Sequence, residues 1–298
     1  MITLEITMCV AKRIGLTGHR VTWFILLLIM ASHASAQNMG IMSFNIRYNN
    51  PQDGINSWDN RKGELVNLVN YYHPDILGLQ EGLQDQIKYM DESMSDYAMI
   101  GVGREDGKLK GEYAAIFYDS TKYKLISQNT FWLSDSPEEV SVGWDAALER
   151  ICTYGLFADN KSKQEFYIFN THFDHVGLNA QKKSAELITK KIDELTTDDS
   201  VIILMGDLNC EPASQPILTL EEKLEDGMKI SNKGLYGPSG TFNGFDTTLS
   251  ISQRIDYIFT RNLEVISYRH IDDLRKNKEF VSDHLPVFIQ SNLAVKLQ

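Results

Sequence analysis

The chain is poor in cysteine, and its cysteines are not grouped. Three occur in 298 residues, at Cys9, Cys152 and Cys210. So few thiols exclude a disulfide framework, and the lack of clustered cysteine and histidine excludes a zinc site built on such a cluster. Cys152 and Cys210 adjoin apolar, strand-like segments. We therefore expect two buried free thiols, with a single bridge between them as the alternative.

Basic residues are scarce relative to acidic ones. The sequence has 29 Lys and Arg against 40 Asp and Glu, a formal net charge of −11. This balance argues against long-range attraction to a polyanion, although bound metal ions can reverse the sign of the charge at a site. Linker-like tracts and repeats of fixed period are also lacking, which favours one large domain.

The first 36 residues have the organisation of a secretory signal. Lys12, Arg13 and Arg20 precede the apolar run "VTWFILLLIM", and the small residues of "ASHASAQ" follow. The apolar run is too short to cross a bilayer comfortably. We therefore expect cleavage after Ala36 and export to the periplasm or the extracellular space, with an uncleaved anchor as the alternative. The product would be a monomeric domain at residues 37–298 without a stable membrane anchor.

Hydrophobic patterns predict a mixed α/β fold. Two amphipathic segments, 58–73 and 180–195, have the periodicity of helices, and Asp59 is a plausible N-cap of the first. Strand-like segments surround them, several without a helix in between. These lie at 39–48, 75–81, 113–119, 123–133, 150–159, 165–174, 200–209, 254–260, 263–270 and 284–290. Their order favours mixed sheets with helices outside and two strand-rich halves facing each other.

Apolar strands in this sequence end repeatedly at side chains that can bind a metal ion or a phosphate. In "VIILMGDLNC", extended backbone past Gly206 would point Asp207 and Asn209 to the same side, because strand side chains alternate. The alternative is a polar turn that closes the strand. Converging strand ends are where α/β proteins build sites. The full set is Asn45, Glu81, His172, Asp207, Asn209, Asp256, Asp283 and His284.

Six motifs carry a resemblance to a known superfamily. In chain order they are "SFNIRYN", "ILGLQEG", "NTHFDH", "MGDLN", "RIDYIF" and "VSDHLP". The sequence resembles the endonuclease/exonuclease/phosphatase superfamily, which includes DNase I, exonuclease III, neutral sphingomyelinases, deadenylases and inositol polyphosphate 5-phosphatases. Further stretches, "IGVGREDGKLKGEY", "FWLSDSPEE" and "GWDAALERICTY", are similar to an exported bacterial branch. The resemblance implies a DNase I-like four-layer α/β sandwich, with two mixed sheets face to face and helices outside.

The resemblance also implies catalytic roles. Asp207 would accept the proton of the attacking water or orient that water, and Asn209 would hold the water or a phosphate oxygen. His284, steadied by Asp256, would stabilise charge on the phosphoryl group, and His172 would donate to a phosphate oxygen. Taken singly, each of these residues could equally be a turn acid or a buried, hydrogen-bonded histidine.

A divalent cation is part of the same expectation. Asn45 and Glu81 supply the hard oxygen ligands that suit Mg²⁺ or Mn²⁺, and Asp283 could assist. Exonuclease III-like members have Asn-x-Asp after the first strand, whereas this chain has Asn45-Ile46-Arg47. The second acid is missing there, so the number of ions stays open, and Arg47 adds a positive charge instead.

The expected activity is hydrolysis of a small sugar-, lipid- or inositol-linked phosphoester by in-line attack of water. The runner-up is an exported nuclease, which the dispersed lysines and the acidic net charge disfavour. A phosphate-binding module without catalysis is a further alternative, motivated by the missing acid at position 47. Six side chains are candidates for contacts to the substrate: Arg47, Arg104, Glu112, Trp144, Asp145 and Arg150.

Overall fold

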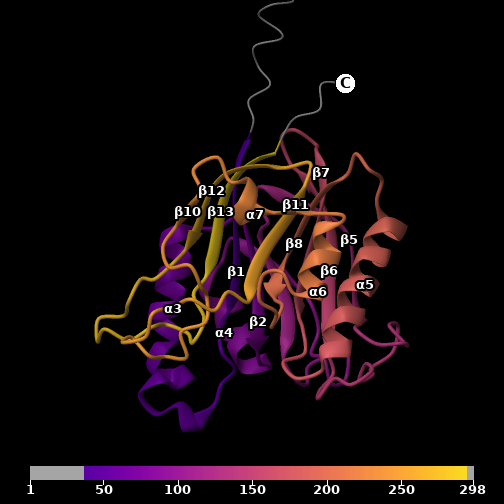
Figure 1. The fold of residues 1–298 in the computed structure, drawn as a ribbon. Helices are drawn as coiled ribbons and strands as arrows, with labels where there is room; N and C mark the ends of the chain where they lie inside the picture. The colour runs from indigo at the N-terminus through magenta and orange to yellow at the C-terminus, as the bar shows by residue number, and fades with distance from the viewer. Residues whose placement is uncertain (1–36, 294–298) are drawn as a thin grey trace, which may run out of the picture. The chain divides into compact units, whose positions relative to one another are not determined.

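Residues 37–293 are described by a computed structural model (Figure 1). The expected signal segment, 1–36, lies outside the described residues, as do residues 294–298. Within residues 37–293, no helix is both long and apolar enough to cross a membrane.

Two mixed sheets form the centre of the described part. The first has the strand order β10-β12-β13-β1-β2-β4-β3 and the second the order β5-β6-β7-β8-β11-β9. Strands of the first sheet are β1 (Gln37–Asn45), β2 (Ile76–Gly82), β3 (Tyr97–Ile100), β4 (Tyr113–Asp119), β10 (Leu235–Tyr236), β12 (Glu264–His270) and β13 (Val287–Leu293). Strands of the second are β5 (Tyr123–Trp132), β6 (Ile151–Asp159), β7 (Glu165–His172), β8 (Val201–Asp207), β9 (Glu225–Asp226) and β11 (Asp256–Arg261).

Helices flank both sheets (Figure 1). The first sheet is covered by α3 (Trp58–Tyr72) and α4 (Gln84–Ser93), with the 3-10 helix η1 (Pro51–Asn56) before them. The second is covered by α5 (Leu178–Leu195) and α6 (Gln215–Glu221), and the short α7 (Gly227–Ile230) follows β9. The expected four-layer α/β sandwich is confirmed.

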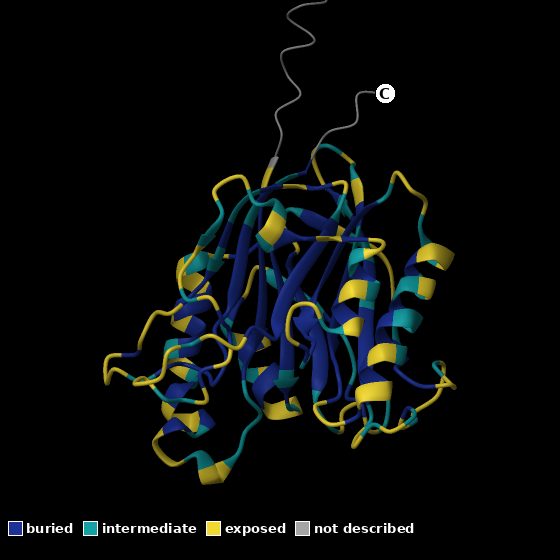
Figure 2. Ribbon diagram, in the orientation of Figure 1, coloured by how far each residue is buried: buried dark blue, intermediate teal, exposed yellow. Residues whose placement is uncertain are grey.

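Because side chains alternate along the strands, apolar side chains form three layers. One layer lies between the two sheets, and one lies between each sheet and the helices that cover it. On β1, Ile41 packs between the two sheets, whereas Met42 faces α3 and α4. On β8, Ile203 packs between the sheets, whereas Leu204 faces α5 and α6. Both faces of these central strands are therefore buried, which explains their continuous apolar runs (Figure 2).

Two expectations about local structure have opposite outcomes. The prediction of Asp59 as an N-cap is wrong: the N-cap of α3 is Ser57, and Asp59 lies in the first helical turn. Its carboxylate pairs with Lys62 and also suits the positive end of the helix dipole. The prediction of buried free thiols is confirmed, because Cys152 and Cys210 are both buried and unbridged.

Candidate active site

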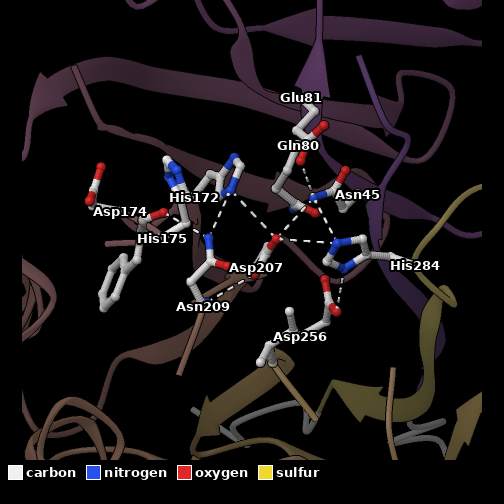
Figure 3. Close-up of polar contacts among 12 residues, drawn as sticks. Asn45, Gln80, Glu81, His172, Asp174, His175, Asp207, Asn209, Asp256 and His284 are labelled. Carbon is white, nitrogen blue, oxygen red and sulfur yellow. Dashed lines mark hydrogen bonds and ion pairs between the residues drawn. The ribbon is translucent and has the colours of Figure 1, made fainter. Parts of the chain in front are cut away.

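The strand ends meet because of the sheet register. Asn45 and Glu81 come from the parallel pair β1 and β2, and His172 lies opposite Asp207 on the parallel pair β7 and β8. Strand β11 runs antiparallel to β8, so its first residue, Asp256, pairs with Asp207, the last residue of β8. Both sheets therefore deliver polar side chains to one edge of the sandwich, where Figure 3 shows them pointing toward one another.

Asp207 lies at the centre of this group. Its Oδ2 accepts a hydrogen bond from Asn45 Nδ2 at 2.9 Å. The same oxygen is 3.5 Å from His172 Nε2 and 3.7 Å from His284 Nε2. Burial raises the pKa of the Asp207 carboxyl, Asp256 raises it further, and the two histidines oppose the shift. These surrounding groups hold the Asp207 carboxylate in one orientation (Figure 3).

Asn209 reaches the site through a turn, which corrects the expected strand alternation. Strand β8 ends at Asp207, and Asn209 has a left-handed φ of 48°. The Asn209 N–H donates to Asp207 Oδ1 at 2.9 Å, which closes a short turn around the Asp207 side chain. The alternative stated from the sequence, a polar turn, describes the backbone correctly, and that turn brings Asn209 beside Asp207.

His284 and Asp256 form a buried charged pair. His284 Nδ1 is 2.9 Å from Asp256 Oδ2. Burial by itself lowers the pKa of His284, but Asp256 and Asp207 outweigh it and raise this pKa well above its ordinary value. An imidazolium is therefore the favoured form, and its Nε2 faces Asp207 and the Asn45 amide. This group can stabilise negative charge that develops next to Asp207.

His172 is held in the neutral form. Burial lowers its pKa to about 3, and the nearby Arg150 acts in the same direction. Asn209 Nδ2 lies 3.1 Å from His172 Nε2 and the same distance from the carbonyl oxygen of Phe173. This geometry favours Nε2 as a hydrogen-bond acceptor. Donation from His172 to a phosphate oxygen would need the proton on Nε2 and stays a prediction.

One group of side chains fits a divalent cation. Glu81, Asp207 and His284 each have a ligand-type atom within 4.8 Å of the others. A protonated His284 has no lone pair for a metal ion, so the two carboxylates are the ligands available. The two carboxylates match the oxygen preference of Mg²⁺ and Mn²⁺. Asn45 places its amide nitrogen, rather than its oxygen, against Glu81 and Asp207. Its Oδ1 accepts from the Arg47 N–H, so the coordination by Asn45 that we expected stays a prediction.

Asp283 lies at the cavity wall beside Arg47. Burial raises the pKa of Asp283 to about 6, and the Arg47 and His284 cations oppose the shift. Arg47 Nε is 3.7 Å from Asp283 Oδ2 and 3.1 Å from Asp53 Oδ2. A nearby cation favours the ionised form of such a buried acid and so lowers its pKa. Assistance to a metal ion by Asp283 stays a prediction.

Three residues of the site have a backbone conformation that L-residues adopt infrequently. The φ angles are 55° at Arg47, 64° at Glu81 and 48° at Asn209. At Glu81 the register between β2 and β4 shifts, as in a β-bulge, and the Tyr48 N–H donates to its carboxylate at 3.1 Å. Such strain persists where surrounding contacts over-determine it, which is common at active sites.

A cavity of about 650 Å³ opens over these side chains. Three of the candidate substrate contacts line it, namely Arg47, Glu112 and Arg150. Arg104 lies behind it, where it forms two hydrogen bonds to the Glu112 carboxylate. Four further lining residues, Tyr48, Leu148, His175 and Ile255, lie within motifs quoted from the sequence but were not named as site residues, whereas Phe242 and Gln253 lie outside every motif.

Trp144 and Asp145 have contacts of another kind. Trp144 donates from Nε1 to Asp135 at 3.0 Å, and it is not among the cavity-lining residues. The Asp145 carboxylate accepts from the N–H groups of Asn179 and Ala180 in the first turn of α5. It thereby satisfies free donors at the helix start. A substrate contact from either residue stays a prediction.

Comparison with known proteins places the chain in a family. The model of the Endonuclease/Exonuclease/phosphatase family matches residues 42–284. A family protein from Bacteroides thetaiotaomicron has a similar structure, with a TM-score of 0.82 and 36% identity over 87% of this chain and 98% of that chain. A mannosyl-6-phosphatase from Bacteroides thetaiotaomicron gives a TM-score of 0.81 and 36% identity over 85% and 99%.

A curated relative extends the comparison beyond bacteria. An uncharacterised protein of Acanthamoeba polyphaga mimivirus is 30% identical over 262 residues, which are 79% of this chain and 92% of the relative. The residues that the family model matches include every strand end that carries the site. The chain therefore belongs to the endonuclease/exonuclease/phosphatase family of phosphoester hydrolases.

Proposed function

We propose that the protein is a divalent-metal-dependent phosphatase or phosphodiesterase for a small, hydroxyl-rich phosphoester, with sugar phosphates as the first class to test. The observation that carries the proposal is that Asp207 and His284 line one cavity side by side, while Asn45 and Asp256 hold them from behind by hydrogen bonds. This arrangement places a base next to a cation, with an amide that holds the base in position. Export of the chain and its monomeric state stay predictions.

Different side chains would activate the attacking water and stabilise the phosphoryl charge during in-line hydrolysis. The Asp207 carboxylate would orient the attacking water and accept its proton, and Asn209 would keep that carboxylate in place through its N–H. The His284 imidazolium, held by Asp256, would stabilise the charge on the phosphoryl oxygens. The Asn45 amide donates to both Glu81 and Asp207, so it would hold these two carboxylates in place beside the phosphoryl group.

The acids of the floor would hold the cation. Glu81 would be its ligand, and Asp283, whose charge interacts with that of Glu81, would contribute a second acid, while Asp207 acts as the base. Bound there, Mg²⁺ or Mn²⁺ supplies Lewis-acid stabilisation to a non-bridging phosphate oxygen.

Charge pairing in the cavity favours a small substrate over a polyanion. Among the cavity-lining residues, Arg47 is paired with Asp53 and Arg150 with Asp174. A nuclease grips successive phosphates through unpaired cations. The wall instead includes the Glu112 carboxylate, which can accept, and the Arg150 guanidinium, which can donate, a combination suited to hydroxyl groups. The structurally similar mannosyl-6-phosphatase supports the same substrate class.

The test is a substrate panel with residues 37–298. Sugar 6-phosphates, inositol phosphates, sphingomyelin, RNA and plasmid DNA are compared at two salt concentrations, with Mg²⁺, with Mn²⁺ and with EDTA. We expect turnover of a small ester that EDTA abolishes and that salt changes little. Rapid plasmid nicking that collapses with salt, together with no turnover of any small ester, would establish the nuclease alternative.

Matched variants separate catalysis from folding. Asp207→Asn keeps the shape of the side chain and removes the base, so kcat should fall by at least about a hundredfold. Asp193→Asn, at an acid half-exposed on α5 and paired with Lys223, is the control and should keep wild-type turnover. Tight binding of a phosphorylated ligand without turnover under any divalent cation would support the non-catalytic alternative.

A further inference from the structure

A buried arginine lies behind the wall of the active site. Arg61 belongs to α3, and its side chain is fully shielded from solvent. Its guanidinium donates to four backbone carbonyl oxygens. The distances are 2.9 Å to Asn56, 2.6 Å to Ile46, 2.7 Å to Arg47 and 3.1 Å to Val281.

The partners of Arg61 are unusual for a buried cation. Within residues 37–293, no carboxylate lies within ion-pair distance of Arg61; its nearest partners are carbonyl dipoles and two aromatic rings. Its Cζ is 5.2 Å from the ring centre of Trp58 and 5.8 Å from that of Phe245. Burial lowers the pKa of Arg61 to about 10, so the group is still charged at neutral pH. The planar guanidinium has N–H donors that point in several directions and can reach all four carbonyls. The single ammonium group of a lysine cannot.

Three of the four carbonyls belong to segments that carry the site. Ile46 and Arg47 directly follow Asn45, and Val281 precedes Asp283 and His284 by two and three residues. Phe245 belongs to the loop that presents Phe242, whose ring lies 5.1 Å from the His284 ring. Arg61 thus joins the loop after β1 to the segment before β13. Asn45 Nδ2 and His284 Nε2 face each other at 3.5 Å across the junction of these two segments.

We propose that Arg61 is a positioning residue that sets the separation between the Asn45 amide and the His284 imidazole by holding the two segments that carry them. The activity readout of this proposal rests on the proposed function. A displacement of about 1 Å between groups that act together can cost on the order of a hundredfold in rate. Loss of the guanidinium fork should therefore affect turnover more than substrate binding.

Arg275 provides a matched control. It is also buried, and it donates to Asn56 Oδ1 and to the Asn60 carbonyl oxygen. Its contacts hold η1 and α3, whereas none of its described hydrogen bonds reaches the segments at Ile46, Arg47 or Val281. Arg275→Lys should thus cost stability in the same region without changing the separation of Asn45 and His284.

The experiment compares Arg61→Lys with Arg275→Lys at a temperature at which circular dichroism shows both variants to be folded. For Arg61→Lys we expect kcat to fall by roughly ten- to a hundredfold with KM changed by less than about threefold. For Arg275→Lys we expect both constants within about twofold of wild type. Equal losses of kcat in the two variants, or an unchanged kcat in Arg61→Lys, would overturn the proposal.

A spectroscopic readout works without turnover and separates this proposal from the proposed function. The proton between His284 Nδ1 and Asp256 Oδ2 should give a downfield resonance, assigned by its absence in His284→Asn. We expect this resonance to shift or vanish in Arg61→Lys and to stay in place in Arg275→Lys. An unchanged resonance in both would refute positioning, whereas an inactive wild type with the expected shift would refute only the proposed function.

A second variant covers the case in which Arg61→Lys does not fold. Phe245→Leu removes one ring from the guanidinium and leaves all four carbonyl acceptors in place. We expect a folded protein in which the His284 resonance moves and kcat falls by about two- to fivefold. A folded Phe245→Leu protein with wild-type resonance and wild-type kcat would count against the proposal.

Discussion

Replacement of Asp256 by asparagine isolates the charge that holds His284. The pair is 2.9 Å apart, both side chains are almost fully buried, and within residues 37–293 the other oxygen, Asp256 Oδ1, has no hydrogen-bond partner. An asparagine at this position still accepts a hydrogen bond from Nδ1, so the geometry is kept and the charge is lost. A hydrogen bond to a charged group contributes about 1.5–3 kcal/mol. If the transition state needs the His284 imidazolium and loses this stabilisation in the variant, kcat should fall by about 10- to 150-fold.

The pH profile gives the sharper assay of the same change. In the wild type the pKa of His284 is raised well above its ordinary value, so activity that needs the imidazolium is lost only as the pH rises through that high value. Without the Asp256 charge, the largest effect that opposes burial is lost, and the pKa of His284 falls. The alkaline limb of log kcat should then move to lower pH in Asp256→Asn.

A buried acid elsewhere supplies the control for this comparison. Asp226 pairs with Arg254 at 2.6 Å and does not line the cavity. Asp226→Asn should lower the urea midpoint and keep the alkaline limb where it is. An Asp256→Asn enzyme with wild-type kcat and an unmoved alkaline limb would refute the role assigned to the pair.

Three further outcomes follow from contacts outside the catalytic groups. Gly206→Ala should destabilise the fold by at least about 2 kcal/mol in urea titrations, because Gly206 has a φ of 151° and a Cβ there would lie 2.0 Å from the Thr171 carbonyl oxygen; an unchanged midpoint would contradict this. Burial lowers the pKa of His270 to about 4 from 6.5, so its contribution to stability should be complete above about pH 6.5 and decline, by roughly 3 kcal/mol in all, as the pH falls to about 4. The free energy of unfolding should decline less over this pH range in His270→Asn than in the wild type. An equal dependence on pH in the two proteins would contradict the assignment to His270. Cys152 and Cys210 are buried and free, and burial raises the pKa of both thiols; a thiol reagent should therefore label both in denaturant and neither in the native protein.

Much of the site could be predicted because it is built from strand ends. A strand that is buried on both faces must be apolar, so a polar residue at its end is conspicuous, as at Asn45 and Asp207. The sheet register then brings these ends together without any further signal. Asn209 was placed correctly beside Asp207, but through a left-handed turn rather than through extended backbone.

The structural roles of three other residues could not be predicted from the sequence. Arg61 lies in an amphipathic helix, where an arginine is ordinarily a solvated side chain, and its acceptors are carbonyl groups that every residue possesses. Phe242 lines the cavity from an irregular loop, where no periodicity marks an inward face. Asp145 was singled out for its chemistry, whereas its hydrogen bonds are those of a cap on α5. Long-range contacts decided each of these cases.

The most direct test of the central claim follows the oxygen atom of the attacking water. The sugar phosphate that the panel identifies is hydrolysed with Mg²⁺ in water labelled with oxygen-18, by the wild type and by Asp207→Asn. In-line attack at phosphorus predicts one labelled oxygen in each released phosphate, none in the sugar, and at least about a hundredfold slower release in the variant. Label in the sugar, or equal rates for the two proteins, would contradict the mechanism.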